Sequence, residues 1–297
     1  MADLIKNMSN AEYQKHPAIS RSMLKELYES PKKYHYKYLS GDYEDGDSHA
    51  LDIGTAYHLL ILEPENFADV IAIAPDDKKK PTKAQINAKN PSDSTLLLIE
   101  WWDNFNAANE GKVILKEKDI DEIKAMAKAM RSTPEAQKIL AQKGLIEPVV
   151  TWKDEDTGLD IKVKMDFVWL DRTIAVDLKS TADCSEDSFS RSIAKYGYDL
   201  QAYMQTEAVR RLEGKPPEAF IFATQEKKPP YETAFYVADA DMIEAGRVKF
   251  KYLTRTLKEC LDNNVWPSKV RGLKSIGLPV WEQKKVDELR GEIEDVE

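Results

Sequence analysis

Hydrophobic and polar residues follow different periods in the two halves of the chain. Up to about residue 142, apolar residues recur every three to four positions, which is the pattern of helices with one buried face. The predicted helices span residues 20–39 with a break at Ser30-Pro31, 50–62, about 95–109, and 119–142 with a break near Thr133-Pro134. Residues 74–95 contain Pro75, Pro81, Pro91 and a run of lysines at 78–80, which predicts an exposed, mobile loop.

From residue 147 onward, polar and apolar residues alternate. Three strands are predicted at 147–153, 159–169 and 174–180, with turn signals at Asp156-Thr157-Gly158 and at residues 170–173. Short turns join antiparallel strands, so these segments form an antiparallel meander. The remaining predicted elements are helices at 184–196, 198–213 and 239–263, strands at 218–225 and 231–238, and a charged, solvated tail from 284. This order predicts an α/β domain with a helical N-terminal part.

The composition limits the cellular setting and the kinds of site. The 297 residues are 42% hydrophobic, which is sufficient for one large domain or two small ones. No run of 18 apolar residues occurs and the first residues lack an apolar segment, so we expect no membrane span and no secretory signal. Cys184 and Cys260 lie far apart, which argues against a disulfide framework and a Cys-x-x-Cys metal site and fits a reducing cytoplasm.

The formal net charge of −9, taken alone, argues against a nucleic-acid binder, because phosphate contacts need Lys and Arg. The chain nevertheless contains 43 Lys and Arg residues, and an acidic enzyme can still have a basic channel. No glycine-rich phosphate loop, Ser-His-Asp pattern or cysteine nucleophile stands out, so we expect no ATP use and no nucleotide cofactor.

The strongest chemical signal is a segment of two aspartates and a lysine, MDFVWLDRTIAVDLK, at residues 165–179. A two-residue turn at Asp171-Arg172 would place Asp166 directly opposite Asp177, with their Cβ atoms about 4.5–5.5 Å apart. Strand side chains repeat every two residues, so Lys179 shares a face with Asp177. Two acidic side chains and one basic side chain therefore converge on one face of the predicted hairpin.

The preceding strand adds charged residues to this face. A turn centred on Asp156-Thr157 would place Glu147 opposite Asp166, as a third carboxylate. Lys162 and Lys164 share the face of Asp166, where they line a DNA groove or are ordinary surface charges of a strand.

Carboxylates placed this closely repel one another, and a divalent cation would remove that cost. Oxygen ligands select Mg²⁺ or Mn²⁺, which lowers the pKa of a bound water and stabilises charge on a phosphoryl group. A neighbouring lysine can orient that water and neutralise the phosphate. Ordinary surface charges of a hairpin would give the same residues, but the apolar neighbours of Asp166 and Asp177 favour a functional site.

The spacing from Asp166 to Asp177-Leu178-Lys179 resembles the PD-(D/E)xK nuclease superfamily. The wider pattern is similar to the exodeoxyribonuclease VIII (RecE-type) phage recombination exonucleases. The further segments that carry this resemblance are residues 19–24 with 30–31, 54–58 with 62–65, 147–158, and 198–203. The resemblance covers about residues 19–270, and we expect a single nuclease domain over residues 1–270 and a charged C-terminal extension over 271–297.

The resemblance implies a role for each matching residue. His58, Asp166 and Asp177 would bind the metal ion, which we expect to be Mg²⁺, with Mn²⁺ able to replace it. The backbone carbonyl of Leu178 would complete the site, and the hairpin geometry adds Glu147 as a further ligand. Without the resemblance, His58 would be interpreted as an ordinary core histidine, because it lies on an apolar helix.

Two further residues receive roles from the resemblance. Lys179 would be the catalytic lysine, and Gln201 would help to position that lysine or the scissile phosphate. In related nucleases a tyrosine often follows this glutamine by four positions, whereas this chain has Gln205 there and Tyr203 two positions after Gln201. Met165 stands where the motif has a leading proline.

The resemblance also implies the fold and the activity. The fold would be α/β with a restriction-endonuclease-like core, in which helices flank a central mixed sheet containing the antiparallel catalytic meander. The activity would be Mg²⁺-dependent exonucleolytic digestion of linear double-stranded DNA, 5′ to 3′, which leaves 3′ single strands for annealing-type recombination. Two alternatives remain open: an endonuclease with the same site, and a catalytically inactive phage DNA-binding protein.

The resemblance further implies partners and a setting. The family forms rings around DNA, so we expect a ring-shaped homo-oligomer. A single-strand annealing recombinase is the expected protein partner, and the expected location is the cytoplasm of a bacterial host of a phage or prophage.

Overall fold

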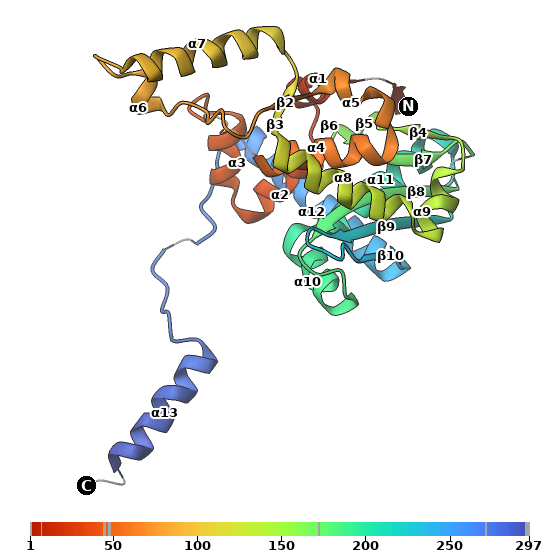
Figure 1. Cartoon of the computed structure of the whole chain (residues 1–297). Helices are drawn as coiled ribbons and strands as arrows, with labels where there is room; N and C mark the ends of the chain where they lie inside the picture. Colours follow the sequence, from red (N-terminus) through yellow and green to blue (C-terminus); the bar gives the residue numbers. More distant parts are fainter. Residues whose placement is uncertain are drawn as a thin grey trace.

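A five-stranded mixed sheet forms the centre of the computed structural model, which describes residues 2–6, 8–43, 46, 49–171, 173–270 and 272–294 (Figure 1). In sheet order, its strands are β10 (Thr233–Val237), β9 (Ala219–Glu226), β8 (Ile174–Thr181), β7 (Phe167–Trp169) and β4 (Gly144–Ile146). Strands β8 and β9 pair in parallel, whereas the other neighbours pair antiparallel. The predicted α/β fold with a central mixed sheet is confirmed.

A smaller antiparallel sheet lies next to β4 and β7 along the chain and consists of β1 (Ala2–Ile5), β5 (Val149–Lys153) and β6 (Asp160–Lys164). The predicted meander is therefore present, but its second strand, 159–169, is divided between the two sheets as β6 and β7. Opposite it the chain is divided into β4, which was not predicted, and β5, which is the first predicted strand. The division falls at Glu147-Pro148, where proline lacks the N–H needed for a ladder and Glu147 has a φ of 47°. Two backbone bonds keep the segments together, from Glu147 N to Asp166 O (3.0 Å) and from Met165 N to Pro148 O (3.1 Å).

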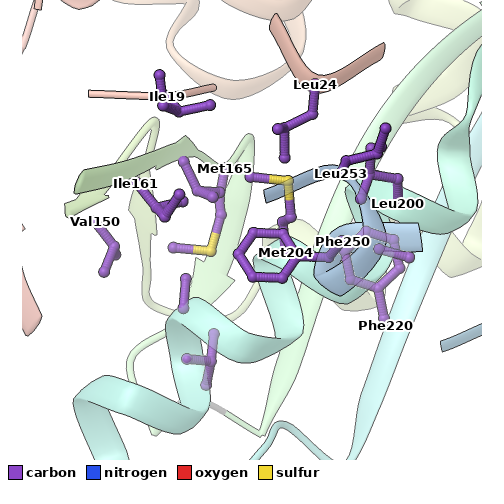
Figure 2. Packing of buried hydrophobic residues seen from close by; sticks show 14 of the residues in the cluster. Ile19, Leu24, Val150, Ile161, Met165, Leu200, Met204, Phe220, Phe250 and Leu253 are labelled. Atoms are coloured by element: carbon purple, nitrogen blue, oxygen red, sulfur yellow. The ribbon is translucent and has the colours of Figure 1, made fainter. Parts of the chain in front are cut away.

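Helices cover the five-stranded sheet on both faces and give two apolar cores. On one face, Val168, Ala175 and Phe222 pack against α2 (Arg21–Glu29), α11 (Tyr198–Glu213) and α12 (Ala240–Asn263). Figure 2 shows part of this core, in which Leu24, Met204 and Phe250 lie close together.

On the other face, Phe167, Val176 and Leu178 belong to a core with α4 (His49–Leu62), α8 (Glu117–Arg131) and α9 (Pro134–Leu140). Strand side chains alternate between faces, so Asp177, between Val176 and Leu178, is directed toward α11.

Other elements surround this arrangement. They are α1 (Asn10–Lys15), α3 (Pro31–Tyr38), the 3₁₀ turn η1 (Pro64–Asn66), α5 (Phe67–Val70), the parallel pair β2 (Ile71–Ala74) and β3 (Val113–Lys116), α6 (Lys83–Ile86), α7 (Asp93–Ala108), α10 (Glu186–Tyr196) and α13 (Val280–Glu294). Figure 1 shows α6 and α7 extending from the folded body, and α13 at the end of an extended segment. No described helix is both long and apolar enough to cross a membrane.

Most predicted helices and their breaks are confirmed. Ser20 caps α2, and Pro31 and Pro134 each begin a new helix. The prediction of a continuous loop over residues 74–95 is wrong, because α6 and the start of α7 lie there. Helix α6 begins at a capping box of Thr82 and Gln85, a local signal that outweighs the neighbouring prolines.

Candidate active site

Asp166 and Asp177 lie next to each other across the hairpin of β7 and β8. The register pairs Phe167 with Val176, so the next opposed positions are those of the two aspartates, and the predicted register is confirmed. Asp166 lies just before β7, and its Oδ2 accepts a hydrogen bond of 2.7 Å from the backbone N–H of Leu178. The carboxylate of Asp166 therefore takes the place of a strand in binding this edge of β8.

Asp177 is fully buried, and hydrogen bonds or an ion pair engage both of its oxygens. Its Oδ1 accepts hydrogen bonds from the Nε2 atoms of Gln201 (2.5 Å) and Gln205 (3.2 Å), both on α11. Its Oδ2 forms an ion pair with Lys179, two residues further along β8. These partners offset the desolvation of a charged carboxylate in the interior.

Asp166 has a different electrostatic environment. Its Oδ1 lies 3.5 Å from Nδ1 of His58, which comes from α4. Burial is the main cause that raises the pKa of Asp166; the charges of His58 and Lys179 oppose this rise, and that of Asp177 adds to it. A cation bound beside this carboxylate would stabilise its charged form and thereby lower the raised pKa.

Arg21 extends this network to the N-terminal helices. Its Nη2 donates to Oε1 of Gln201 over 2.6 Å, and its guanidinium lies 5.8 Å from the ring centre of Tyr198. The ammonium group of Lys179 lies 5.0 Å from the same ring. Burial lowers the pKa of Arg21, and the nearby charge of Asp177 opposes that effect. Arg21, Tyr198 and Gln205 are therefore site residues whose contacts we did not predict.

Glu147 lies opposite Asp166 in the backbone, as predicted, but its carboxylate has another partner. It forms an ion pair with Lys164. Glu63, just after α4, belongs to the same acidic group: its pKa is raised first by burial and then by the charge of Glu147. The sequence pattern placed Glu63 only within a matching segment and gave it no chemical role.

Protein oxygens engage the ammonium groups of Lys162 and Lys164, the two residues for which the sequence predicts DNA contacts. Lys162 is only 3% exposed, and its Nζ donates to the carbonyls of Tyr13 (2.5 Å) and His16 (2.7 Å). Lys164 is bound by Glu147 and by Oδ1 of Asn10 at 2.7 Å. Both lysines hold the N-terminal segment against β6, because that segment brings carbonyl groups that no pattern within the strand could indicate.

A cavity of about 280 Å³ is lined in part by Gln201 and Gln205, the two glutamines that bond Asp177. The polar residues that matter most in its lining are Ser20, Arg21, Ser22, Gln201 and Gln205. A guanidinium group, hydroxyl groups and amides are groups that bind phosphate oxygens.

The residues around Asp166 fit a divalent cation chemically. They supply two carboxylates, an imidazole and the Leu178 backbone, a set in which oxygen predominates. Oδ2 of Asp177 is buried without a hydrogen bond, although it is paired with Lys179, so this oxygen can serve a cation. A search of the described residues for three possible metal ligands with donor atoms within 4.8 Å of one another gives a different group, which consists of Cys184, Glu226 and Glu232.

Comparisons with known proteins agree with this fold. The model of a family described as a PDDEXK-like domain of unknown function (DUF3799) matches residues 20–275. The structure is similar to a crystal structure from Eubacterium rectale that is described as a "Putative exonuclease", with a TM-score of 0.57 and 14% identity. The similarity covers 93% of this chain and 98% of that one, and at this identity it shows a shared fold alone. No curated protein matches the chain.

Proposed function

The chain belongs to the family of PDDEXK-like domains of unknown function (DUF3799), and on that premise we propose that it is a metal-dependent exodeoxyribonuclease. The proposed reaction is digestion of linear double-stranded DNA, 5′ to 3′, leaving 3′ single strands for annealing-type recombination. The observation that carries the proposal is the group of Asp166, Asp177 and Lys179, held at one edge of β8 by Leu178 N–H, Gln201 and Gln205. Ordinary surface charges would not be buried and bonded in this way.

Asp166, Asp177, His58 and the Leu178 carbonyl are the residues that would hold the ion, which we propose to be Mg²⁺, with Mn²⁺ able to replace it. When bound, such an ion lowers the pKa of a water ligand and stabilises negative charge on a phosphoryl group. Glu147 stays a candidate for an outer position, since Lys164 neutralises its carboxylate.

We propose Lys179 as the catalytic lysine, and its surroundings support this role. Its side chain is 15% exposed, and its ammonium group lies between the carboxylate of Asp177 and the ring of Tyr198. From there it can donate a hydrogen bond to the attacking water or to a phosphate oxygen. Gln201 orients Asp177 instead of Lys179, because its amide N–H bonds the carboxylate and its carbonyl accepts from Arg21.

We propose that a phosphate of the substrate strand occupies the cavity lined by Gln201 and Gln205. Arg21 supplies a guanidinium group, and Ser20 and Ser22 supply hydroxyl groups, within reach of the two glutamines. Lys162 adds positive charge to the cavity wall, although its ammonium group donates to protein carbonyls, whereas the charge of Lys164 is offset by Glu147. The overall charge of −9 therefore does not oppose local binding of DNA.

Digestion of defined DNA tests the activity. Purified chain with Mg²⁺ should degrade a linear duplex, whereas Asp177→Ala and Lys179→Ala should not. No difference between the wild type and these variants would mean that the chain is a DNA-binding protein without nuclease activity.

The form of the DNA separates the exonuclease from the endonuclease alternative. A covalently closed circular duplex should stay intact, since it offers no end. Duplexes labelled at the 5′ or the 3′ end would give the polarity, and early release of the 5′ label is the expected result.

We also propose the assembly and setting that the resemblance implies. The chain would form a ring-shaped homo-oligomer, cooperate with a single-strand annealing recombinase, and act in the cytoplasm of a bacterial host of a phage or prophage. Mass measurement of the intact assembly in solution tests the first of these proposals, and a monomeric mass would contradict it.

A further inference from the structure

Two amides from one helix bind the same oxygen of Asp177. Gln201 and Gln205 are four residues apart on α11, so their side chains lie on one face of the helix. Their Nε2 atoms lie 2.5 and 3.2 Å from Oδ1 of Asp177. Oδ2 of the same carboxylate pairs with Lys179. The two oxygens of Asp177 therefore have different tasks, with Oδ1 bound by amides and Oδ2 directed to the charged part of the site.

The two glutamines differ at their other end. The Oε1 atom of Gln201 accepts a hydrogen bond of 2.6 Å from Arg21, which fixes the orientation of that amide. Among the described residues, Oε1 of Gln205 has no hydrogen-bond partner, although Gln205 is only 1% exposed. A buried acceptor without a partner costs free energy, which a leucine of similar size would avoid. The contact with Asp177 is thus what an amide at position 205 offers and an apolar side chain does not.

We propose that Gln205 is a positioning residue for Asp177 and thereby for the metal ion. It would hold Oδ1 so that Oδ2 faces the cation and Lys179. The inference rests on the proposed metal-dependent function. Outer hydrogen-bond partners of a ligating carboxylate fix its orientation, and losing one typically weakens metal binding about 10–100-fold.

Two variants, Gln205→Leu and its control Gln225→Leu, distinguish a residue that positions Asp177 from one that only supports the fold. Gln225 on β9 is also buried, but both ends of its amide are bonded: Oε1 accepts from Tyr57 (2.7 Å) and Nε2 donates to the Met126 carbonyl (2.9 Å). It therefore serves as a matched control outside the contacts of Asp177. The measurements are Mn²⁺ affinity by titration calorimetry and the thermal midpoint without metal, both on the full chain.

The two variants should each change a different property. Gln205→Leu should weaken Mn²⁺ binding about tenfold or more, with little loss of thermal stability, because it also removes the unpaired acceptor. Gln225→Leu should lower the thermal midpoint and leave the Mn²⁺ affinity close to that of the wild type. Wild-type Mn²⁺ affinity in Gln205→Leu would overturn the proposal, as would an equal loss of affinity in both variants.

Two further measurements keep these outcomes interpretable. If Gln205→Leu does not fold, Gln205→Asn provides the same test, because its amide is one methylene too short to reach Asp177. If the wild type itself does not bind Mn²⁺, the proposed function fails together with this inference. If the wild type binds Mn²⁺ and both Gln205 variants bind it equally well, the result contradicts the role of Gln205 but not the proposed function.

Discussion

Asp166 and Leu178 are joined across the hairpin, because Oδ2 of the aspartate accepts the backbone N–H of the leucine over 2.7 Å. A strand residue directs its N–H and its C=O toward the same edge, so the carbonyl of Leu178 also faces Asp166. Strand β7 pairs with β8 only as far as Phe167 and Val176. The short strand thus leaves this edge of β8 to a carboxylate, and both groups that we propose as oxygen ligands lie where the ladder stops.

Substitutions at Asp177 and Lys179 should separate metal binding from catalysis. Asp177→Asn keeps the shape of the side chain but removes its charge, so we expect loss of both Mn²⁺ binding and DNA cleavage. Lys179→Ala removes the cation that competes for Oδ2, so Mn²⁺ binding should be retained or strengthened while cleavage falls about 100- to 1000-fold. Calorimetry and digestion of a linear duplex measure the two effects, and loss of Mn²⁺ binding in Lys179→Ala would contradict the assignment.

The hairpin could be predicted because local residues determine it. Turn signals in the sequence at 156–158 and 170–173 predict the register that the strands adopt, and alternation places Asp177 and Lys179 on one face. The bonds from α11 to Asp177 depend on how a distant helix packs, and strand periodicity contains no information about that packing. The sequence marks Gln205 only as a departure from the family's tyrosine, although its position one turn after Gln201 is a usable signal.

Lys162 shows what strand periodicity could not predict. Periodicity assigned Lys162 a face, but the N-terminal segment docks on that face and its carbonyls take up the ammonium group. Strand β1 was likewise missed, since four residues of ordinary composition become a strand only by pairing with β5. Such pairing over a long sequence distance has no local signature.

The stability of the metal-free protein should fall as pH rises because of Asp166. Burial raises the pKa of this carboxyl, so the folded chain keeps its proton after the unfolded chain, with a pKa of about 3.9, has released it. Between these two pKa values the folded state binds more protons, and the free energy of unfolding decreases with increasing pH. Thermal midpoints across this range should decline less in Asp166→Asn than in the wild type.

Added Mn²⁺ should reverse this trend, because the ion binds the deprotonated carboxylate. The rise in thermal midpoint caused by Mn²⁺ should therefore grow with pH over the same range. An Mn²⁺ effect that does not depend on pH would show that Asp166 is not a ligand.

Close packing of α12 on α11 should be necessary for the site. A Cβ at Gly246 would collide with the backbone carbonyl of Asp199 and would lie 2.6 Å from Cβ of Tyr203. Gly246→Ala should therefore destabilise the fold by about 1–3 kcal/mol and, by displacing α11, weaken Mn²⁺ binding. Gly54→Ala on α4 is the control: a Cβ there meets nothing within 4 Å, so it should stabilise the helix by about 0.5–1 kcal/mol. Equal stability of the two variants would contradict this account.

The proposed boundary between a nuclease domain at 1–270 and an extension at 271–297 can be tested by truncation. The body includes Trp266, whose ring stacks on Tyr34 with centres 5.7 Å apart. Beyond it, Leu273 and Ile276 are almost completely exposed, so their removal should cost little packing energy. A chain ending at Val270 should keep its Mn²⁺ affinity and its free energy of unfolding within about 0.5 kcal/mol. A larger loss in the truncated chain, measured by denaturant unfolding, would place the extension within the domain.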